Sequence, residues 1–265
     1  MSKSTIPNVL SIAGSDPSGG AGIQADLKTM SALGCYGMAA ITALTVQNTQ
    51  GVSGVFDIPA DFVKAQIDVI FEDVEVAAVK IGMLAQPDII NVIADALEKY
   101  KSPHIVLDPV MVATSGDPLI SSEAIGVLKE RLIPMATIIT PNISEAQKLS
   151  RKAVLDLEVA AMELLGLGSG AVFLKGGHLK EEQARDVLAM SGGDIHEFSA
   201  PRIDTLNTHG TGCTLSSAIA AYLALGEEMA GACEKAKVYL SGALGAADDL
   251  QVGCGHGPVH HGWGK

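Results

Sequence analysis

Residues 9–30 read VLSIAGSDPSGGAGIQADLKTM, and this stretch decides the fold. The apolar run from Val9 to Ala13 has the length and composition of a buried strand. After it, Ile23, Leu27 and Met30 recur at the spacing of one helix face, with a glycine-rich turn between the two patterns. The stretch therefore predicts a strand that leads through a tight turn into a helix, the first unit of a βα series.

The same alternation continues along the chain. Apolar segments predict further strands at 39–46, 77–81, 104–107, 137–140 and 171–174, and helical spacing marks segments around 62–70, 89–97, 157–165 and 218–223. Short apolar strands between helices indicate a mostly parallel sheet with helices on both faces. We found no repeat or linker that divides the sequence, so we expect one α/β domain over residues 1–265.

Composition limits the kinds of molecule that the protein binds and the cellular compartment in which we expect it. A formal net charge of -12 disfavours binding to nucleic acid, and the four cysteines show no CxxC spacing. The start of the chain lacks the long apolar segment of an export signal, and polar residues 47–50 interrupt the uncharged run after Lys28. We therefore expect a cytoplasmic protein without a membrane span.

Two glycine motifs compete for the role of phosphate site. The first, at 14–22, leads into the spacing of a dinucleotide-binding turn at 20–25, but no acidic residue lies between Ser31 and Phe56 and no Lys-Ser/Thr pair directly follows the glycines. Nicotinamide binding and a P-loop are therefore disfavoured. We predict instead a turn that brings the backbone close to a small substrate.

The second motif, Thr208 to Ser217, runs into the helix-forming segment 218–223. Backbone N–H groups at the start of a helix attract an anion, and glycine lets them converge on it. A helix start that merely packs through small residues remains the alternative at this point.

The chain resembles the hydroxymethylpyrimidine/phosphomethylpyrimidine kinases of thiamine biosynthesis, in the ribokinase superfamily. The resemblance rests on ordered blocks that span nearly the whole sequence: Ala13–Asp26, Ile41–Thr49, Val79–Met83, Val106–Met111, Ile139–Ala146, Leu174–His178, Asn207–Ser216 and Gly257–His261. It implies a ribokinase-like three-layer sandwich, and phosphorylation by ATP of 4-amino-5-hydroxymethyl-2-methylpyrimidine and then of its monophosphate. It further implies Mg2+ as cofactor, K+ as a further candidate cation, and a homodimer.

Two other functions remain open. Pyridoxal/pyridoxine kinases are closely related and phosphorylate the same kind of ring-borne hydroxymethyl group, although Gln47-Asn48-Thr49 favours the pyrimidine. A non-catalytic pyrimidine-phosphate binding protein on the same fold would be expected to lose Cys213, Glu145 or Lys175, and all three are present.

The resemblance implies roles for individual residues. Gly210, Thr211 and Gly212, with Lys175, would bind ATP and stabilise the transferred phosphoryl group. The Asn142-to-Glu145 element, together with Asp108, would organise the metal, although Glu145 is also a common type of first-turn helix carboxylate. Cys213 stands where the wider superfamily carries an aspartate base. A helix N-terminus lowers a thiol's pKa, so Cys213 is a candidate general base, with simple packing as the alternative.

The substrate residues are predicted partly from side-chain chemistry and partly from the resemblance. A carboxamide offers the donor and acceptor that an aminopyrimidine edge requires, and Gln47 fits that role. The resemblance adds Gly14, Asp26 and Met83; a solvated helix carboxylate is the alternative for Asp26, and a core residue is the alternative for Met83. The tail residues Cys254, His256, His260 and His261 have the side chains of a metal site but lack its paired spacing.

Overall fold

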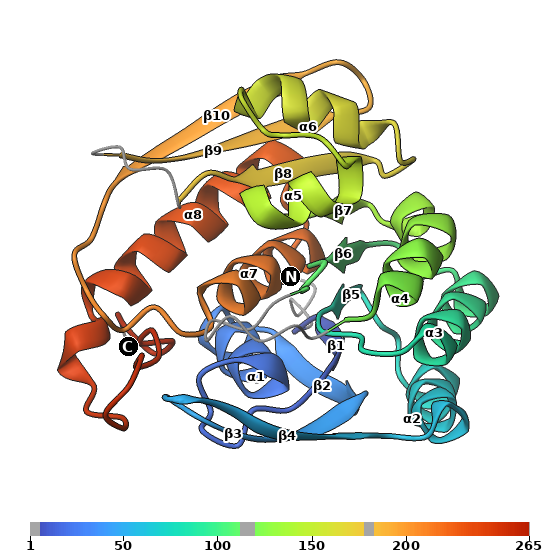
Figure 1. Ribbon diagram of the computed structural model, residues 1–265. Helices are drawn as coiled ribbons and strands as arrows, with labels where there is room; N and C mark the ends of the chain where they lie inside the picture. The colour runs from blue at the N-terminus through green and yellow to red at the C-terminus, as the bar shows by residue number, and fades with distance from the viewer. Residues whose placement is uncertain (1–5, 112–119, 178–182, 265) are drawn as a thin grey trace, which may run out of the picture.

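The computed structural model describes residues 6–111, 120–177 and 183–264, so the N-terminal residues 1–5 and His178 lie outside the described chain. Its centre is an eight-stranded sheet in the order β10-β9-β8-β7-β6-β5-β1-β2 (Figure 1). The predicted mostly parallel sheet is confirmed, and only the β9 and β10 edge is antiparallel. Its strands are β1 (Asn8–Ala13), β2 (Tyr36–Ile41), β5 (Ala78–Ile81), β6 (Ile105–Leu107), β7 (Ile138–Ile139), β8 (Ala171–Lys175), β9 (Gln183–Met190) and β10 (Ile195–Pro201).

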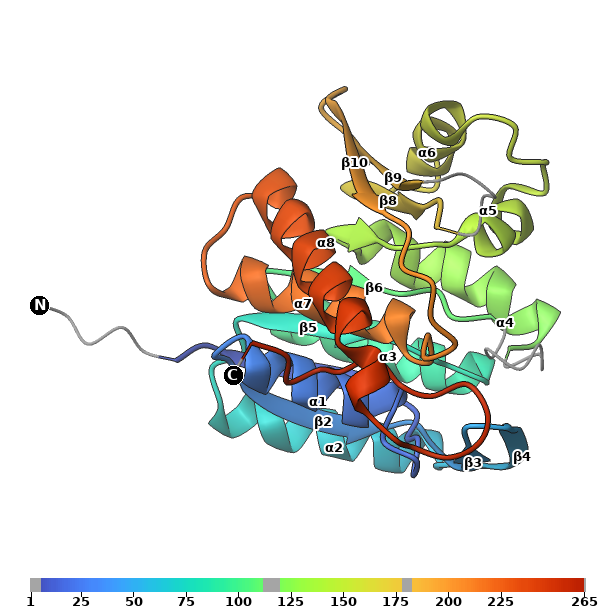
Figure 2. The same ribbon diagram turned by 90° about the vertical axis from the view of Figure 1, so that its left-hand side faces the viewer.

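Helices cover both faces of the sheet and complete three layers (Figure 1), and Figure 2 looks onto the layer that contains α7 and α8. One face packs against α1 (Gly22–Ala32), α7 (Thr211–Ala224) and α8 (Met229–Gly245). The other packs against α2 (Ala60–Asp73), α3 (Pro87–Tyr100), α4 (Ser122–Val127), α5 (Ile143–Ser150) and α6 (Leu157–Leu165). None of the helices in the described ranges has the length and hydropathy that crossing a membrane requires.

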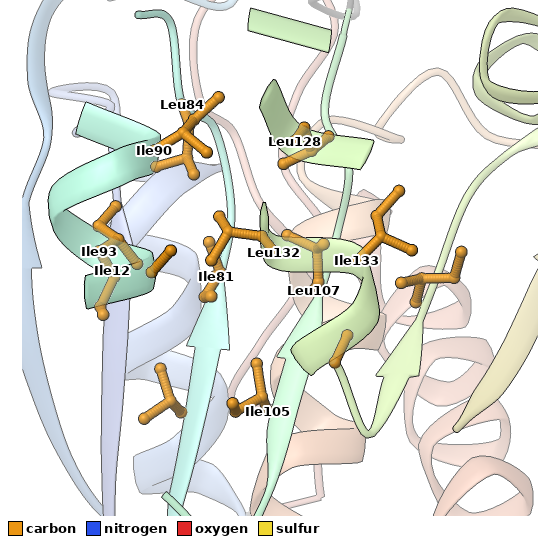
Figure 3. Packing of buried hydrophobic residues seen from close by; sticks show 14 of the residues in the cluster. Ile12, Ile81, Leu84, Ile90, Ile93, Ile105, Leu107, Leu128, Leu132 and Ile133 are labelled. Atoms are coloured by element: carbon orange, nitrogen blue, oxygen red, sulfur yellow. The ribbon is translucent and has the colours of Figure 1, made fainter. Parts of the chain in front are cut away.

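The strands feed two separate cores because successive side chains point to opposite faces of a sheet. Ile12, Ile81 and Leu107 point toward α3 and the helical turns after α4, where they meet Ile93 and Leu132 (Figure 3). The strand residues that alternate with these three point to the opposite face of the sheet, toward α1 and α7. Both faces of β1, β5 and β6 are therefore buried, and any polar side chain inside these strands needs a buried partner.

The predicted single strand at 39–46 is wrong. The chain leaves the main sheet after β2, and Ala43–Asn48 forms β3, which pairs with β4 (Gly51–Asp57) in a separate two-stranded sheet. Thr42 makes the transition: its N–H donates to the Ala13 carbonyl and its hydroxyl to the Met83 carbonyl. These bonds anchor the start of β3 beside the ends of β1 and β5.

A charged pair lies buried between the sheet and the α1/α7 layer. Lys80 of β5 places its Nζ 2.8 Å from both carboxylate oxygens of Asp26 on α1, and both side chains are fully buried. The hydroxyls of Ser11 on β1 and Ser217 on α7 each donate to Asp26 at 2.6 Å. Burial lowers the pKa of Lys80, but the negative neighbours, Asp26 foremost and Asp108 with it, together outweigh burial and raise the pKa, so the lysine stays charged. Four elements are thus tied together at one carboxylate.

Removing one partner of this pair leaves the other charge buried without compensation. We expect Lys80→Met to lower the free energy of unfolding by about 3–5 kcal/mol, measured by chemical denaturation. Lys152→Met is the matched control, because Lys152 pairs with Glu163 on the exposed surface, where such a pair contributes about 1 kcal/mol or less. Equal losses for the two variants would contradict a structural role for the buried pair.

Candidate active site

The parallel strands end at one edge of the sheet, and the residues that follow them gather there. The side chain of Met83, after β5, packs against Gly14, which follows β1: a Cβ on Gly14 would lie 3.5 Å from the Met83 sulfur. Asp108 follows β6, and Lys175 ends β8. Ligands of open α/β sheets bind at this edge, so the fold brings most of the predicted site residues together where the sequence analysis expected them.

Lys175 and Asp108 form the charged centre of the site. The Lys175 Nζ lies 2.9 Å from Asp108 Oδ1, which also accepts from the Thr140 hydroxyl at 3.1 Å. A Cβ on Gly212 would lie 3.4 Å from both the Lys175 Nζ and Asp108 Oδ2. Burial lowers the pKa of Lys175, but Asp108 and Glu145 outweigh it and raise the pKa, so the ammonium is charged. A fixed cation therefore sits directly beside the predicted anion loop.

Glu145 and Asn142 cap the start of α5. The Asn142 side chain accepts from the Glu145 N–H at 2.9 Å, and Glu145 Oε2 accepts from the Asn142 N–H at 2.8 Å, a reciprocal capping box. Glu145 thus lies in the first turn of a helix, as the alternative for it assumed, and it also caps that helix. Burial raises the pKa of Glu145 to about 7; Lys175 opposes this and Asp108 adds to it. A cation bound beside Glu145 and Asp108 would stabilise the charged form of this buried carboxylate, which otherwise holds its proton.

The two glycine motifs touch each other. Gly210 has a φ of 79°, and a Cβ there would lie 1.8 Å from the Gly20 carbonyl oxygen, so only glycine fits. α7 begins directly afterwards at Thr211, and helix geometry leaves the N–H groups of Gly212 and Cys213 without a carbonyl partner one turn earlier. The loop therefore presents backbone donors next to Lys175, the arrangement that an anion requires.

Cys213 lies where the starts of α1 and α7 meet. The N–H of Gly22, the first residue of α1, donates to its thiol. The expectation that the helix N-terminus would lower the thiol pKa is wrong: burial raises the pKa of Cys213 to about 11, Lys80 opposes this in part, and Asp26 and Asp108 add to it. The thiol is therefore protonated at neutral pH in this structure, and its role as a general base remains a prediction.

Gln47 and Asp26 occupy different positions relative to this edge. Gln47, on β3, faces inward beside Thr45 and lies 3.5 Å from the Nε2 of His209. Asp26 is fully buried under the site, and its oxygens accept from Lys80, Ser11 and Ser217. Its described contacts make it a support for α1 and α7, and a direct contact with substrate remains a prediction.

Several residues of the site were not identified from the sequence. Lys80 interrupts an otherwise apolar strand, and that break in the pattern was the available signal for a buried ion pair. Asp16 was seen only as part of a turn, and His209 only as the start of the second loop. Their side chains bond to each other at 2.8 Å.

The C-terminal segment closes over the same loops. The N–H of Val259 donates to the His209 carbonyl, and that of His256 donates to the Thr49 carbonyl. Burial lowers the pKa of His261 to about 4. Within the described ranges, no group of three or more His, Cys, Asp or Glu side chains is placed to hold a metal ion on protein ligands alone.

Comparison with known proteins decides the family. The model of the family described as "Phosphomethylpyrimidine kinase" matches residues 16–260. This chain belongs to the phosphomethylpyrimidine kinase family. It is 52% identical over 258 residues to the hydroxymethylpyrimidine/phosphomethylpyrimidine kinase of Escherichia coli K12, and the match covers 96% of this chain and 97% of that relative.

Solved structures agree with this membership in the phosphomethylpyrimidine kinase family. The phosphomethylpyrimidine kinase of Clostridium difficile is 45% identical with a TM-score of 0.79, over 89% of this chain and 98% of that one. The pyridoxal kinase of Bacillus subtilis, solved as an ADP complex, is 39% identical with a TM-score of 0.89, over 97% and 98%. The predicted ribokinase-like α/β fold is confirmed.

The raised pKa of Glu145 makes stability depend on pH. Its pKa is raised from 4.5 to about 7, so the proton it binds stabilises the fold fully below pH 4.5, and this contribution is lost as the pH rises to about 7. Glutamine does not titrate and keeps an oxygen for the Asn142 N–H. We therefore expect the difference in unfolding free energy between Glu145→Gln and wild type to grow, in favour of the variant, by on the order of 1–3 kcal/mol from pH 4.5 to pH 8.

Denaturation at several pH values measures this gain. Glu158→Gln, in the exposed first turn of α6, is the matched control and should not show it. A gap between Glu145→Gln and wild type that stays constant from pH 4.5 to pH 8 would contradict the raised pKa.

Proposed function

We propose that this chain transfers the terminal phosphoryl group of ATP to 4-amino-5-hydroxymethyl-2-methylpyrimidine and then to its monophosphate, as a kinase of thiamine biosynthesis. One observation carries the proposal: the Lys175 ammonium lies directly beside Gly212 at the start of α7, at the carboxyl edge of the sheet. The family membership supplies the class of substrate. Pyridoxal kinase, the alternative function, is the less supported of the two, because the matching family model and the curated relatives are pyrimidine kinases.

Phosphoryl transfer depends on positioning and on neutralising charge, because the transition state spreads negative charge over the transferred oxygens. The N–H groups at the start of α7 would bind those oxygens, and Lys175 would add a positive charge beside them. In this structure Asp108 holds the Lys175 ammonium at 2.9 Å and so keeps it near the loop. Gly210, Thr211, Gly212 and Lys175 are therefore the proposed ATP-binding and catalytic set.

The residues present fit a magnesium ion. Mg2+ prefers oxygen ligands, retains several waters and commonly uses one or two carboxylates together with the phosphates of the substrate. Asp108 and the buried, readily protonated Glu145 provide such carboxylates next to the anion loop, and Asn142 orients Glu145 through the capping box. Bound there, Mg2+ would neutralise phosphate charge. K+ is kept as a second candidate cation on the resemblance alone.

Substrate recognition is assigned to the other glycine turn and its neighbours. Gly14 and Met83 lie in contact and would cover one face of the pyrimidine ring, and Gln47 would read its amino edge. The ring would then place its hydroxymethyl group toward Cys213, which lies between the starts of α1 and α7.

We include a homodimer and a cytoplasmic location in the proposal. One face of the β3–β4 sheet carries Leu44, Val46 and Phe56, which are 44% to 65% exposed. Clustered exposed apolar side chains of this kind mark protein interaction sites, and a two-stranded sheet gains stability when its face is covered. A monomeric mass from light scattering at assay concentration would remove the dimer from the proposal.

The function is tested by ADP release from ATP and Mg2+ with four acceptors in parallel, each with and without K+. We expect turnover with the hydroxymethylpyrimidine and with its monophosphate, weaker turnover with pyridoxal, and none with ribose. Ribose offers hydroxyl groups without an aromatic ring, so it controls for unspecific transfer. Absence of ADP with every acceptor would overturn the kinase proposal, and faster turnover with pyridoxal would favour the alternative.

Two substitutions separate charge neutralisation from proton transfer. Lys175→Met removes the cation beside the anion loop, and we expect kcat to fall by about 10²–10³. Cys213 is protonated at neutral pH, and a dissociative transition state needs little proton removal, so we expect Cys213→Ala to lower kcat by about tenfold or less. A fall of about 10²–10⁴ for Cys213→Ala would instead support its role as the general base.

A further inference from the structure

His209 occupies a junction that the proposed chemistry leaves unused. Its ring is almost fully buried, and its Nε2 lies 2.8 Å from Asp16 Oδ2. The ring packs on Gly20, where an added Cβ would lie 2.5 Å from His209 Cδ2. The backbone on either side of it bonds to the C-terminal segment, from His209 N–H to the Gly257 carbonyl and from Val259 N–H to the His209 carbonyl. The ring is therefore held rigidly between the two glycine motifs.

The partner carboxylate fixes which atom of the imidazole carries hydrogen. Burial opposes the charge of Asp16, but hydrogen bonds from His209, Ser18 and the Ala21 N–H lower its pKa to about 2. Asp16 is therefore ionised at neutral pH and can only accept hydrogen bonds. It follows that the Nε2 of His209 carries a hydrogen and donates it, and any other group in front of Nε2 must be an acceptor.

The end of the Gln47 side chain lies in front of that donor. One terminal atom of its carboxamide is 3.5 Å from His209 Nε2, and the other is 3.2 Å from the hydroxyl of Thr45. The Thr45 hydroxyl has one hydrogen, which it donates to the Ser15 carbonyl at 2.9 Å, so toward Gln47 it can only accept. The carboxamide thus faces a donor at the His209 end and an acceptor at the Thr45 end.

The two ends of a carboxamide are nearly the same size, so hydrogen-bond chemistry decides which of them is oxygen. With nitrogen toward His209 and oxygen toward Thr45, both contacts would be mismatched. Turned by half a rotation, the oxygen takes the weaker, 3.5 Å arm of a bifurcated bond from His209 Nε2–H, whose main acceptor is Asp16, and the nitrogen donates to the Thr45 hydroxyl. Each end then keeps one free position, an acceptor near His209 and a donor near Thr45.

We infer that His209, held by Asp16, is a specificity-determining positioning residue that fixes the order of acceptor and donor which Gln47 presents to the substrate. This rests on the proposed pyrimidine kinase function. In 4-amino-5-hydroxymethyl-2-methylpyrimidine the amino group is next to the reacting hydroxymethyl group, and the ring nitrogen follows. His209 directly precedes the anion loop, where the proposed transfer to the hydroxymethyl group takes place. The amino group beside that hydroxymethyl group therefore meets the oxygen end of Gln47, which faces His209, and the ring nitrogen meets the N–H end.

The 4-oxo counterpart of the substrate reverses this edge, because it offers a carbonyl acceptor beside the hydroxymethyl group and a ring N–H donor after it. A fixed carboxamide accepts the 4-amino compound and leaves two polar contacts mismatched with the 4-oxo compound. A carboxamide that can turn accepts both. The preference between the two compounds therefore reports the orientation of Gln47.

The experiment compares kcat/KM for the two compounds, with ATP as donor, in wild type and in variants. Both compounds use the same anion loop, metal and Cys213, so damage to these parts cancels in the ratio. We expect wild type to prefer the 4-amino compound at least about 30-fold, and His209→Phe to reduce that preference at least about tenfold, mainly through KM. His209→Gln retains an N–H donor and should restore most of the preference.

A second pair of variants tests the other end of the carboxamide and covers the case in which His209→Phe fails to fold. Thr45→Val removes the acceptor and should reduce the preference, and Thr45→Ser should keep it. An unchanged ratio in His209→Phe and Thr45→Val, with both compounds slowed equally, would overturn the inference while leaving the kinase function intact. Wild type without activity on either compound would overturn the kinase function, and the inference with it.

Discussion

The arrangement of the site depends on the buried ion pair between Lys80 and Asp26. Two charges without access to water are stable only together, and Asp26 satisfies its remaining acceptor positions with the hydroxyls of Ser11 and Ser217. These bonds hold α1 and α7 in fixed positions against β1 and β5. Both helices consequently begin at the same edge of the sheet, and the Gly22 N–H at the start of α1 reaches the thiol of Cys213 near the start of α7. The buried pair thereby sets where the phosphate and the hydroxyl would meet.

A second bridge connects the same elements nearer the surface. Asp16 and His209 join the turn before α1 to the loop before α7, and Gly20 and Gly210 let the two backbones touch. In our proposal the Asp16–His209 bridge acts on the substrate through Gln47, whereas the Lys80–Asp26 pair holds the helices in position. The charged residues around the anion loop differ in their contacts: Glu145 shares the capping of α5 with Asn142, and Asp108 holds Lys175, which in the proposed mechanism would neutralise phosphate.

Much of this fold could be predicted from the sequence, because strand and helix periods alternate clearly and polar residues follow each strand. The glycines of the loop from Thr208 to Ser217 and the helix that follows it were enough to predict a candidate phosphate site there. The prediction failed at 39–46, since nothing in an apolar run reveals that Thr42 bonds to Ala13 and Met83 and redirects the chain into a second sheet. It also failed for the pKa of Cys213, because helix polarity is visible in a sequence and the extent of burial is not. Lys80 was visible as a charge inside a strand, but its partner could be found only in three dimensions.

The central claim is that the loop at the start of α7 holds the phosphate and the turn before α1 holds the pyrimidine. A crystal structure with the non-transferable analogue AMP-PCP, Mg2+ and 4-amino-5-hydroxymethyl-2-methylpyrimidine tests it most directly. We predict the terminal phosphate against Gly210 to Cys213 beside Lys175, the ring between Met83 and Gln47, and the hydroxymethyl oxygen facing Cys213. A terminal phosphate bound in the turn at 14–22, with the ring elsewhere, would contradict it.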